Sequence, residues 1–122
     1  MLNALGNLRD AERSLQTSST VSDQTLVHSE LGTVYTYLNQ PAVALEHFQQ
    51  AIKLDARSGK YREVANLQFN VAIMLGNNGQ LKEAIEYATA ALAGYERLGL
   101  GNEFQAQETR RMLGVLRQAQ QH

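Results

Sequence analysis

The chain has 122 residues, a formal net charge of −1 and no cysteine. This charge balance predicts neither a nucleic-acid partner nor an anionic membrane partner, and the lack of cysteine excludes a disulfide framework. No apolar run reaches the roughly 20 residues that span a bilayer, and the amino terminus lacks the pattern of a signal peptide. We therefore expect a cytoplasmic protein.

Three helices are predicted in the first half of the chain. The first covers residues 2–15, where leucine and alanine recur at spacings of three and four residues. A polar loop separates it from a second helix at residues 22–38. The third covers residues 41–56, because Pro41 suits the first turn of a helix, where its missing N–H is not needed.

Three more helices are predicted in the second half. The fourth covers residues 61–75 and ends at the Gly-Asn-Asn-Gly segment of residues 76–79, a strong helix breaker. The fifth covers residues 81–98 and ends at two closely spaced glycines, and the sixth covers residues 102–120. The sequence therefore predicts an all-α fold of about six helices.

The alanines of these helices recur at a constant interval. The recurring positions are Ala4, Ala44 and Ala84, and Ala11, Ala51 and Ala91. Successive positions in each series are 40 residues apart. An internal period of this length predicts stacked repeats, each of them a pair of helices.

Small residues are expected where the helices cross, because helix axes approach to about 8 Å only if little side chain lies between them. The small positions are Gly32, Ala44, Ala72, Ala84 and Gly114. Large side chains are expected to fill the space beside each crossing, namely Tyr35, Phe48, Leu75 and Leu92.

One repeat matches a known pattern closely. Its residues are, in order, His28, Leu31, Gly32, Tyr35, Ala44, Phe48, Ala51 and Ala56. This series resembles the tetratricopeptide repeats, although Ala56 stands where the family usually has proline. The period of about 40–42 residues is longer than the usual 34. It resembles the period of kinesin light chain and of the repeat regions of bacterial regulators.

The resemblance implies a right-handed α-solenoid of antiparallel helix pairs, forming one domain over residues 1–122. Residues 1–17 would be the second helix of an incomplete unit, and residues 22–58 and 61–99 the two repeats. Residues 102–120 would be a carboxy-terminal capping helix, since the end of a solenoid needs a polar outer face. We expect Phe104, Leu113, Val115 and Leu116 to face inward.

The first helix has no partner helix within this sequence. Its apolar residues Leu2, Leu5 and Leu8 are therefore candidates for self-association as a homodimer, since exposed apolar patches mark interaction sites. Alternatively, the chain is a segment of a longer repeat array of a bacterial regulator.

Catalytic and metal-binding motifs are weak. His28 and His47 lie on adjacent predicted helices and could approach each other, but neither has a second ligand at metal-binding spacing. We expect His28 to be structural and His47 to face solvent beside Phe48. The glutamates lie on solvated helix faces, so we expect no enzyme, no metal and no cofactor.

The resemblance implies a concave groove lined by the first helix of each unit. The candidate partner-binding residues are Leu26, Ser29, Thr33, Asn66, Phe69, Asn70, Ile73, Glu108, Arg111 and Val115. Phe69, Ile73 and Val115 are apolar at positions that pack no core in this scheme, which is typical of a ligand-binding surface.

Asn70 is the most specific candidate, because its amide both donates and accepts hydrogen bonds and can bind a peptide backbone of any sequence. It could equally bond across the groove or to water. Relatives that grip a terminal carboxylate use lysine, asparagine and arginine at fixed groove positions. Asn70 could match the asparagine, but Ser29, Thr33, Glu108 and Met112 replace the rest, so we expect no carboxylate clamp. The leading hypothesis is a protein or peptide partner in the groove.

Overall fold

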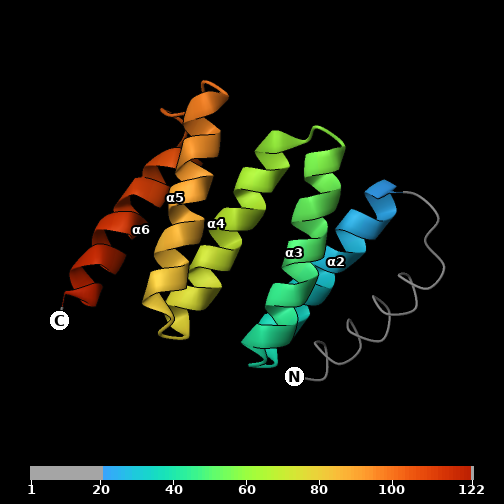
Figure 1. Cartoon of the computed structure of the whole chain (residues 1–122), viewed down its shortest axis with the longest axis horizontal. Coiled ribbons are helices and arrows are strands. Elements are labelled where there is room, and N and C mark those ends of the chain that lie inside the picture. Colours follow the sequence, from blue (N-terminus) through green and yellow to red (C-terminus); the bar gives the residue numbers. More distant parts are fainter. Residues whose placement is uncertain (1–20, 122) are drawn as a thin grey trace. The chain divides into compact units, whose positions relative to one another are not determined.

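The computed structural model describes residues 21–121 of the chain, with side chains from Gln24 onward. The described range consists of α-helices joined by short turns (Figure 1). The helices are α2 (Val21–Tyr37), α3 (Pro41–Arg57), α4 (Tyr61–Asn77), α5 (Leu81–Arg97) and α6 (Phe104–Gln120). The all-α class is confirmed, and each helix begins and ends within two residues of its predicted bounds. The helix expected at residues 2–15 lies outside the described residues.

The turns explain the interval between the recurring alanines. Each helix has 17 residues, and three-residue turns separate α2, α3, α4 and α5. Asn39, Gly59, Gly79 and Gly99 occupy the same place in successive turns, and all have a positive φ, of 60°, 74°, 80° and 76°. A left-handed residue after the last helical turn is the usual way to satisfy the final carbonyls of a helix. A helix with its turn therefore spans half of the alanine interval, and a helix pair spans all of it.

The described residues form two compact units, with the boundary after Gly59. In the first unit, α2 and α3 pack side by side. Val27 and Leu31 form a buried cluster with Tyr35 beside it. Phe48 is buried against the backbone of Gly32, where an added Cβ would lie 2.8 Å from the ring. The close approach predicted at Gly32 is therefore present.

The second unit contains α4, α5 and α6. Its core includes the alanines of the repeat together with Tyr95, which is buried among Ala65, Ala91 and Ala106. Tyr95 is not among the core residues expected from the sequence. It extends the buried spacing of Ala84, Ala88 and Ala91 by one further step of four residues, and Asp55 is buried at the corresponding place one repeat earlier.

The expectations for Phe104 and Gly114 in α6 are wrong. Phe104 does not face inward but is 71% exposed. It is the first residue of α6 and lies about 200° around the helix from the buried Ala106, so it points away from the core. Gly114 is exposed, with no heavy atom within 4 Å of an added Cβ. Gly32 meets the second helix of its own pair, whereas α6 is the last described helix and no following helix packs on Gly114.

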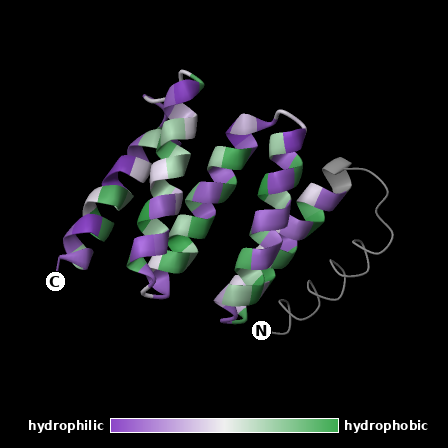
Figure 2. Cartoon of the chain, viewed as in Figure 1, coloured by the Kyte–Doolittle hydropathy of each residue, from purple (hydrophilic) through white to green (hydrophobic). Residues whose placement is uncertain are grey.

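Hydrophilic and hydrophobic residues alternate around α3, α4, α5 and α6 (Figure 2). These four helices therefore bury one stripe each and leave the rest to solvent, as expected for amphipathic helices. On α2 the apolar residues lie on more than one side, since Leu31 is buried and Leu26 is exposed. None of the helices in the described part of the chain combines the length and apolar character that crossing a bilayer requires.

Candidate functional site

The second unit has an open pocket of about 420 Å³ between α4 and α6. This volume lies within the roughly 300–1,000 Å³ usual for ligand pockets. Most of the lining is apolar, and one residue comes from the start of α5. The apolar lining side chains are Phe69, Ala72, Ile73, Leu81, Met112, Val115, Leu116 and Ala119.

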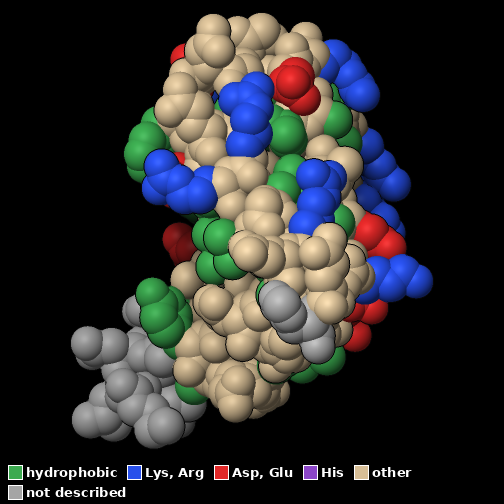
Figure 3. Space-filling model, turned by 90° about the vertical axis from the view of Figure 1, so that its left-hand side faces the viewer, with side chains coloured by type: hydrophobic (Ala, Val, Ile, Leu, Met, Phe, Trp, Pro, Cys, Tyr) green, Lys and Arg blue, Asp and Glu red, His purple; other side chains and the backbone are tan. Residues whose placement is uncertain are grey.

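Parts of this lining are open to solvent. Ile73 is 40% exposed and Val115 62% exposed, whereas Phe69 and Met112 are half-buried. The inward orientation expected for Val115 is therefore wrong, although the same residue lines the pocket as the groove assignment requires. Figure 3 views the molecule from the side of α6, where lysine and arginine side chains lie with apolar side chains between them. An apolar hollow bordered by polar side chains is typical of an interaction site.

The charged residues of the lining belong to one ion pair. Arg111 Nη1 lies 3.1 Å from Glu108 Oε1, one helical turn apart on α6, and the Arg111 side chain is 74% exposed. Such a pair contributes little stability because water screens it. Its polar atoms can therefore exchange partners at small cost when another molecule binds.

Five predicted site residues come together in this pocket, namely Phe69, Ile73, Glu108, Arg111 and Val115. The lining also contains Gly76, Asn77, Leu116 and Ala119, which the site prediction omitted. Gly76 and Asn77 lie three and four residues beyond Ile73, Ala119 lies four beyond Val115, and Leu116 lies four beyond Met112. This helical spacing could have identified them.

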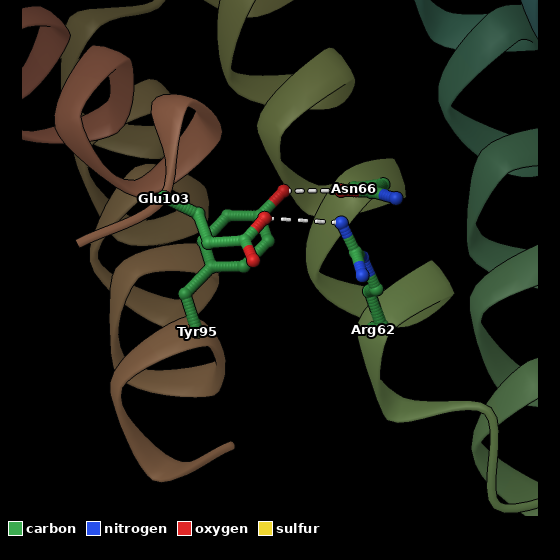
Figure 4. A network of polar contacts seen from close by, with 4 residues as sticks. All are labelled: Arg62, Asn66, Tyr95 and Glu103. Carbon is green, nitrogen blue, oxygen red and sulfur yellow. Dashed lines mark hydrogen bonds and ion pairs between the residues drawn. The ribbon is translucent and has the colours of Figure 1, made fainter. Parts of the chain in front are cut away.

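Asn66 and Asn70 on α4 lie outside the pocket lining. The Tyr95 hydroxyl donates a hydrogen bond to Asn66 Oδ1, and close by Arg62 donates to Glu103 Oε2 at 3.2 Å (Figure 4). Burial raises the pKa of Tyr95, with the Arg62 charge acting weakly in the opposite direction, so the phenol keeps the proton that it donates. Asn66 thus joins α4 to α5, and Asn70 is exposed on α4.

The candidates on α2 belong to the first unit. Leu26 is 59% exposed, Ser29 is half-buried and Thr33 is exposed. The Thr33 hydroxyl donates to the Ser29 carbonyl within the helix at 3.1 Å. Leu2, Leu5 and Leu8 lie outside the described residues, so self-association through them stays a prediction.

The two histidines of the first unit meet, as their positions suggested. Nδ1 of His28 on α2 lies 3.1 Å from Nδ1 of His47 on α3. His47 is half-buried and stacks on the Tyr35 ring, with centroids 5.6 Å apart and planes 4° from parallel. The expectation that His47 faces solvent is therefore wrong, because α3 turns His47 toward α2, next to the buried Phe48.

The His28 pair predicts a pH dependence of stability. Burial, and secondly the charge of His47, lower the pKa of His28 below its ordinary 6.5. Between that lowered pKa and 6.5, the unfolded chain binds more protons, so stability falls as pH falls through this range. Between about pH 7.5 and 5, we expect the free energy of unfolding to fall less in His28→Gln than in the natural chain. Urea unfolding monitored by circular dichroism measures this difference. The other titratable side chains described on these helices are common to both proteins, namely Glu30, Tyr35, Tyr37, Glu46, His47, Lys53, Asp55 and Arg57. If the free energy of unfolding fell equally with pH in both proteins, this prediction would be contradicted.

A comparison with protein-family models identifies the architecture. The model of the tetratricopeptide repeat matches residues 23–97, which is more than half of the chain. The chain belongs to the tetratricopeptide repeat family. Tetratricopeptide repeats typically mediate protein–protein interactions and are typically non-enzymatic. No curated protein matches the chain.

A solved tetratricopeptide structure has the same fold. It is the crystal structure of BtubC (BKLC) from P. vanneervenii, a kinesin light chain-like protein, which superposes with a TM-score of 0.74 at 22% sequence identity. The match covers 93% of this chain and 46% of BtubC, so the chain spans about half the length of that relative. The likeness agrees with the long repeat period and shows the solenoid fold.

Proposed function

We propose that the pocket between α4 and α6 binds a peptide or protein segment through that segment's apolar side chains. The observation that carries this proposal is the partly exposed apolar lining at Ile73 and Val115. Burying such side chains against a partner gains roughly 25 cal/mol for each Å² of apolar surface removed from water. A core residue would have no such surface left to bury.

Polar groups at the border of the pocket would orient the partner. Arg111 can donate two parallel hydrogen bonds to a partner carboxylate if its exposed pair with Glu108 opens. Asn77 lines the pocket and Asn70 is exposed on the same helix, so their amides could bond a partner's backbone. A micromolar dissociation constant, about −8 kcal/mol, would be ordinary for such a site.

Substitutions in the pocket should abolish binding without unfolding the chain. Phe69 packs against the core around Tyr95, so Phe69→Ala combined with Asn70→Ala would also lower stability. Ile73→Ser is the sharper variant, because Ile73 is already 40% exposed. The matched control is Leu98→Ser, since Leu98 is 41% exposed and lies outside the pocket lining.

The probe is a fluorescent peptide selected from a random library on the natural chain. We expect Ile73→Ser to weaken its binding by about 2 kcal/mol or more in an anisotropy titration, as for a central interface residue. Leu98→Ser should bind as the natural chain does, and both variants should keep their helical circular dichroism. A peptide that binds Ile73→Ser with unchanged affinity would move the site elsewhere on the molecule.

A further inference from the structure

A second chemical feature lies in the first unit, apart from the pocket. His28 and His47 face each other across α2 and α3, with Nδ1 atoms 3.1 Å apart and ring centroids 5.3 Å apart. Both side chains are half-buried and therefore still reachable by water and small ions. The contact between the rings satisfies one polar nitrogen on each, and it also brings two possible metal ligands side by side.

The short contact limits the protonation of the pair. A hydrogen bond between two imidazole nitrogens requires a donor and an acceptor, so at least one of the two rings is neutral. A neutral imidazole nitrogen is the commonest protein ligand of late transition metals.

The separation of the two nitrogens also suits chelation. Imidazole nitrogens bind a metal at about 2.0–2.1 Å, which places two tetrahedral ligands about 3.3 Å apart. The observed 3.1 Å is close to that spacing, so a rotation of each ring by roughly 35° would direct both nitrogens at one tetrahedral ion. The stack of His47 on Tyr35 limits the orientations that the ring can adopt and so lowers the entropy lost on binding.

We propose that His28 and His47 form a two-imidazole site for a divalent transition-metal ion that bridges α2 and α3. The described residues contain no group of three or more metal-ligating side chains, so water completes the coordination. With two nitrogen ligands and an open shell, affinity follows the general order of the divalent ions: Cu²⁺ binds most tightly, ahead of Ni²⁺ and Zn²⁺. An ion in this position crosslinks the helix pair and stabilises the first unit.

Calorimetric titration of the tag-free chain with CuCl₂, NiCl₂ and ZnCl₂ tests the site. We expect one Cu²⁺ ion to bind per chain. Either His28→Gln or His47→Gln should lower the affinity for Cu²⁺ by about 10–100-fold or more, which is the effect of removing a supporting group from a metal site. His122→Gln, which removes the remaining histidine of the chain, is the control and should bind as before. Binding that survives both single substitutions, or that disappears in His122→Gln, overturns the proposal.

Two measurements on the natural chain avoid any effect of substitution on folding. Because the metal displaces the proton shared by the rings, affinity should rise with pH, and the heat of binding should change with the ionisation enthalpy of the buffer. Pulsed electron paramagnetic resonance of the one-to-one Cu²⁺ complex should detect two coordinated imidazoles. A complex with a single imidazole would show that the pair does not chelate.

Discussion

Replacing Gly32 with leucine is expected to lower the free energy of unfolding by about 1–3 kcal/mol or more, the cost of overpacking a filled core. A Cβ at this position would lie 2.8 to 2.9 Å from three atoms of the Phe48 ring. Phe48 is only 3% exposed, so its ring has no free space to enter. The helices must separate, or Phe48 must leave its rotamer. Urea unfolding followed by circular dichroism measures the loss.

Gly114→Leu is the matched control, because Gly114 follows a buried leucine in α6 as Gly32 does in α2. An added Cβ at Gly114 meets no heavy atom within 4 Å. Leucine is a better helix former than glycine by up to about 1 kcal/mol, so this variant should be as stable as the natural chain or more stable. If both leucine variants changed stability equally, the close contact at Gly32 would have no energetic role.

The helices and their pairing could be predicted because they depend on local patterns. Spacings of three and four residues mark the buried stripe of a helix, and each turn from Asn39 to Gly99 needs one residue with positive φ. The alanines at Ala44 and Ala84 then relate one helix pair to the next, and both are fully buried. The resemblance to the tetratricopeptide repeat family could be predicted from the same positions.

The contacts between side chains of different helices could not be predicted in this way. Asn66 and Tyr95 are far apart in the sequence, and the helical position of Asn66 alone does not show that the two side chains form a hydrogen bond. His47 looked exposed by its place next to Phe48, because a helical pattern does not show which neighbouring ring will cover a half-buried position.

The pocket was predictable in part for a physical reason. Ile73 and Val115 stand out because they are apolar on a helix face that packs no core, and both line the pocket. Asn70, a candidate of the same groove set because of its amide, lies on α4 outside the lining. The apolar character of Ile73 and Val115 therefore added information that the groove position alone did not supply.

Replacing Tyr95 with alanine should have the largest effect on stability in the second unit, about 3–5 kcal/mol, as for other buried aromatic side chains. The Tyr95 ring is 2% exposed and is surrounded by Ala65, Ala91 and Ala106. Phe69, Leu92 and Leu100 also pack against this cluster, and how far they move into the space left by the ring sets the cost within that range. Urea unfolding measures the loss.

Tyr95→Phe separates the packing of the ring from the hydrogen bond to Asn66. It keeps the ring and removes only the hydroxyl, so it should cost about 0.5–1.5 kcal/mol, the net worth of one hydrogen bond. A phenylalanine variant as unstable as the alanine variant would show that the bond between α4 and α5, rather than the ring, supports the core. Because Ile73 is not part of the Tyr95 cluster, Tyr95→Phe should also bind the selected peptide with little change, whereas Ile73→Ser should not.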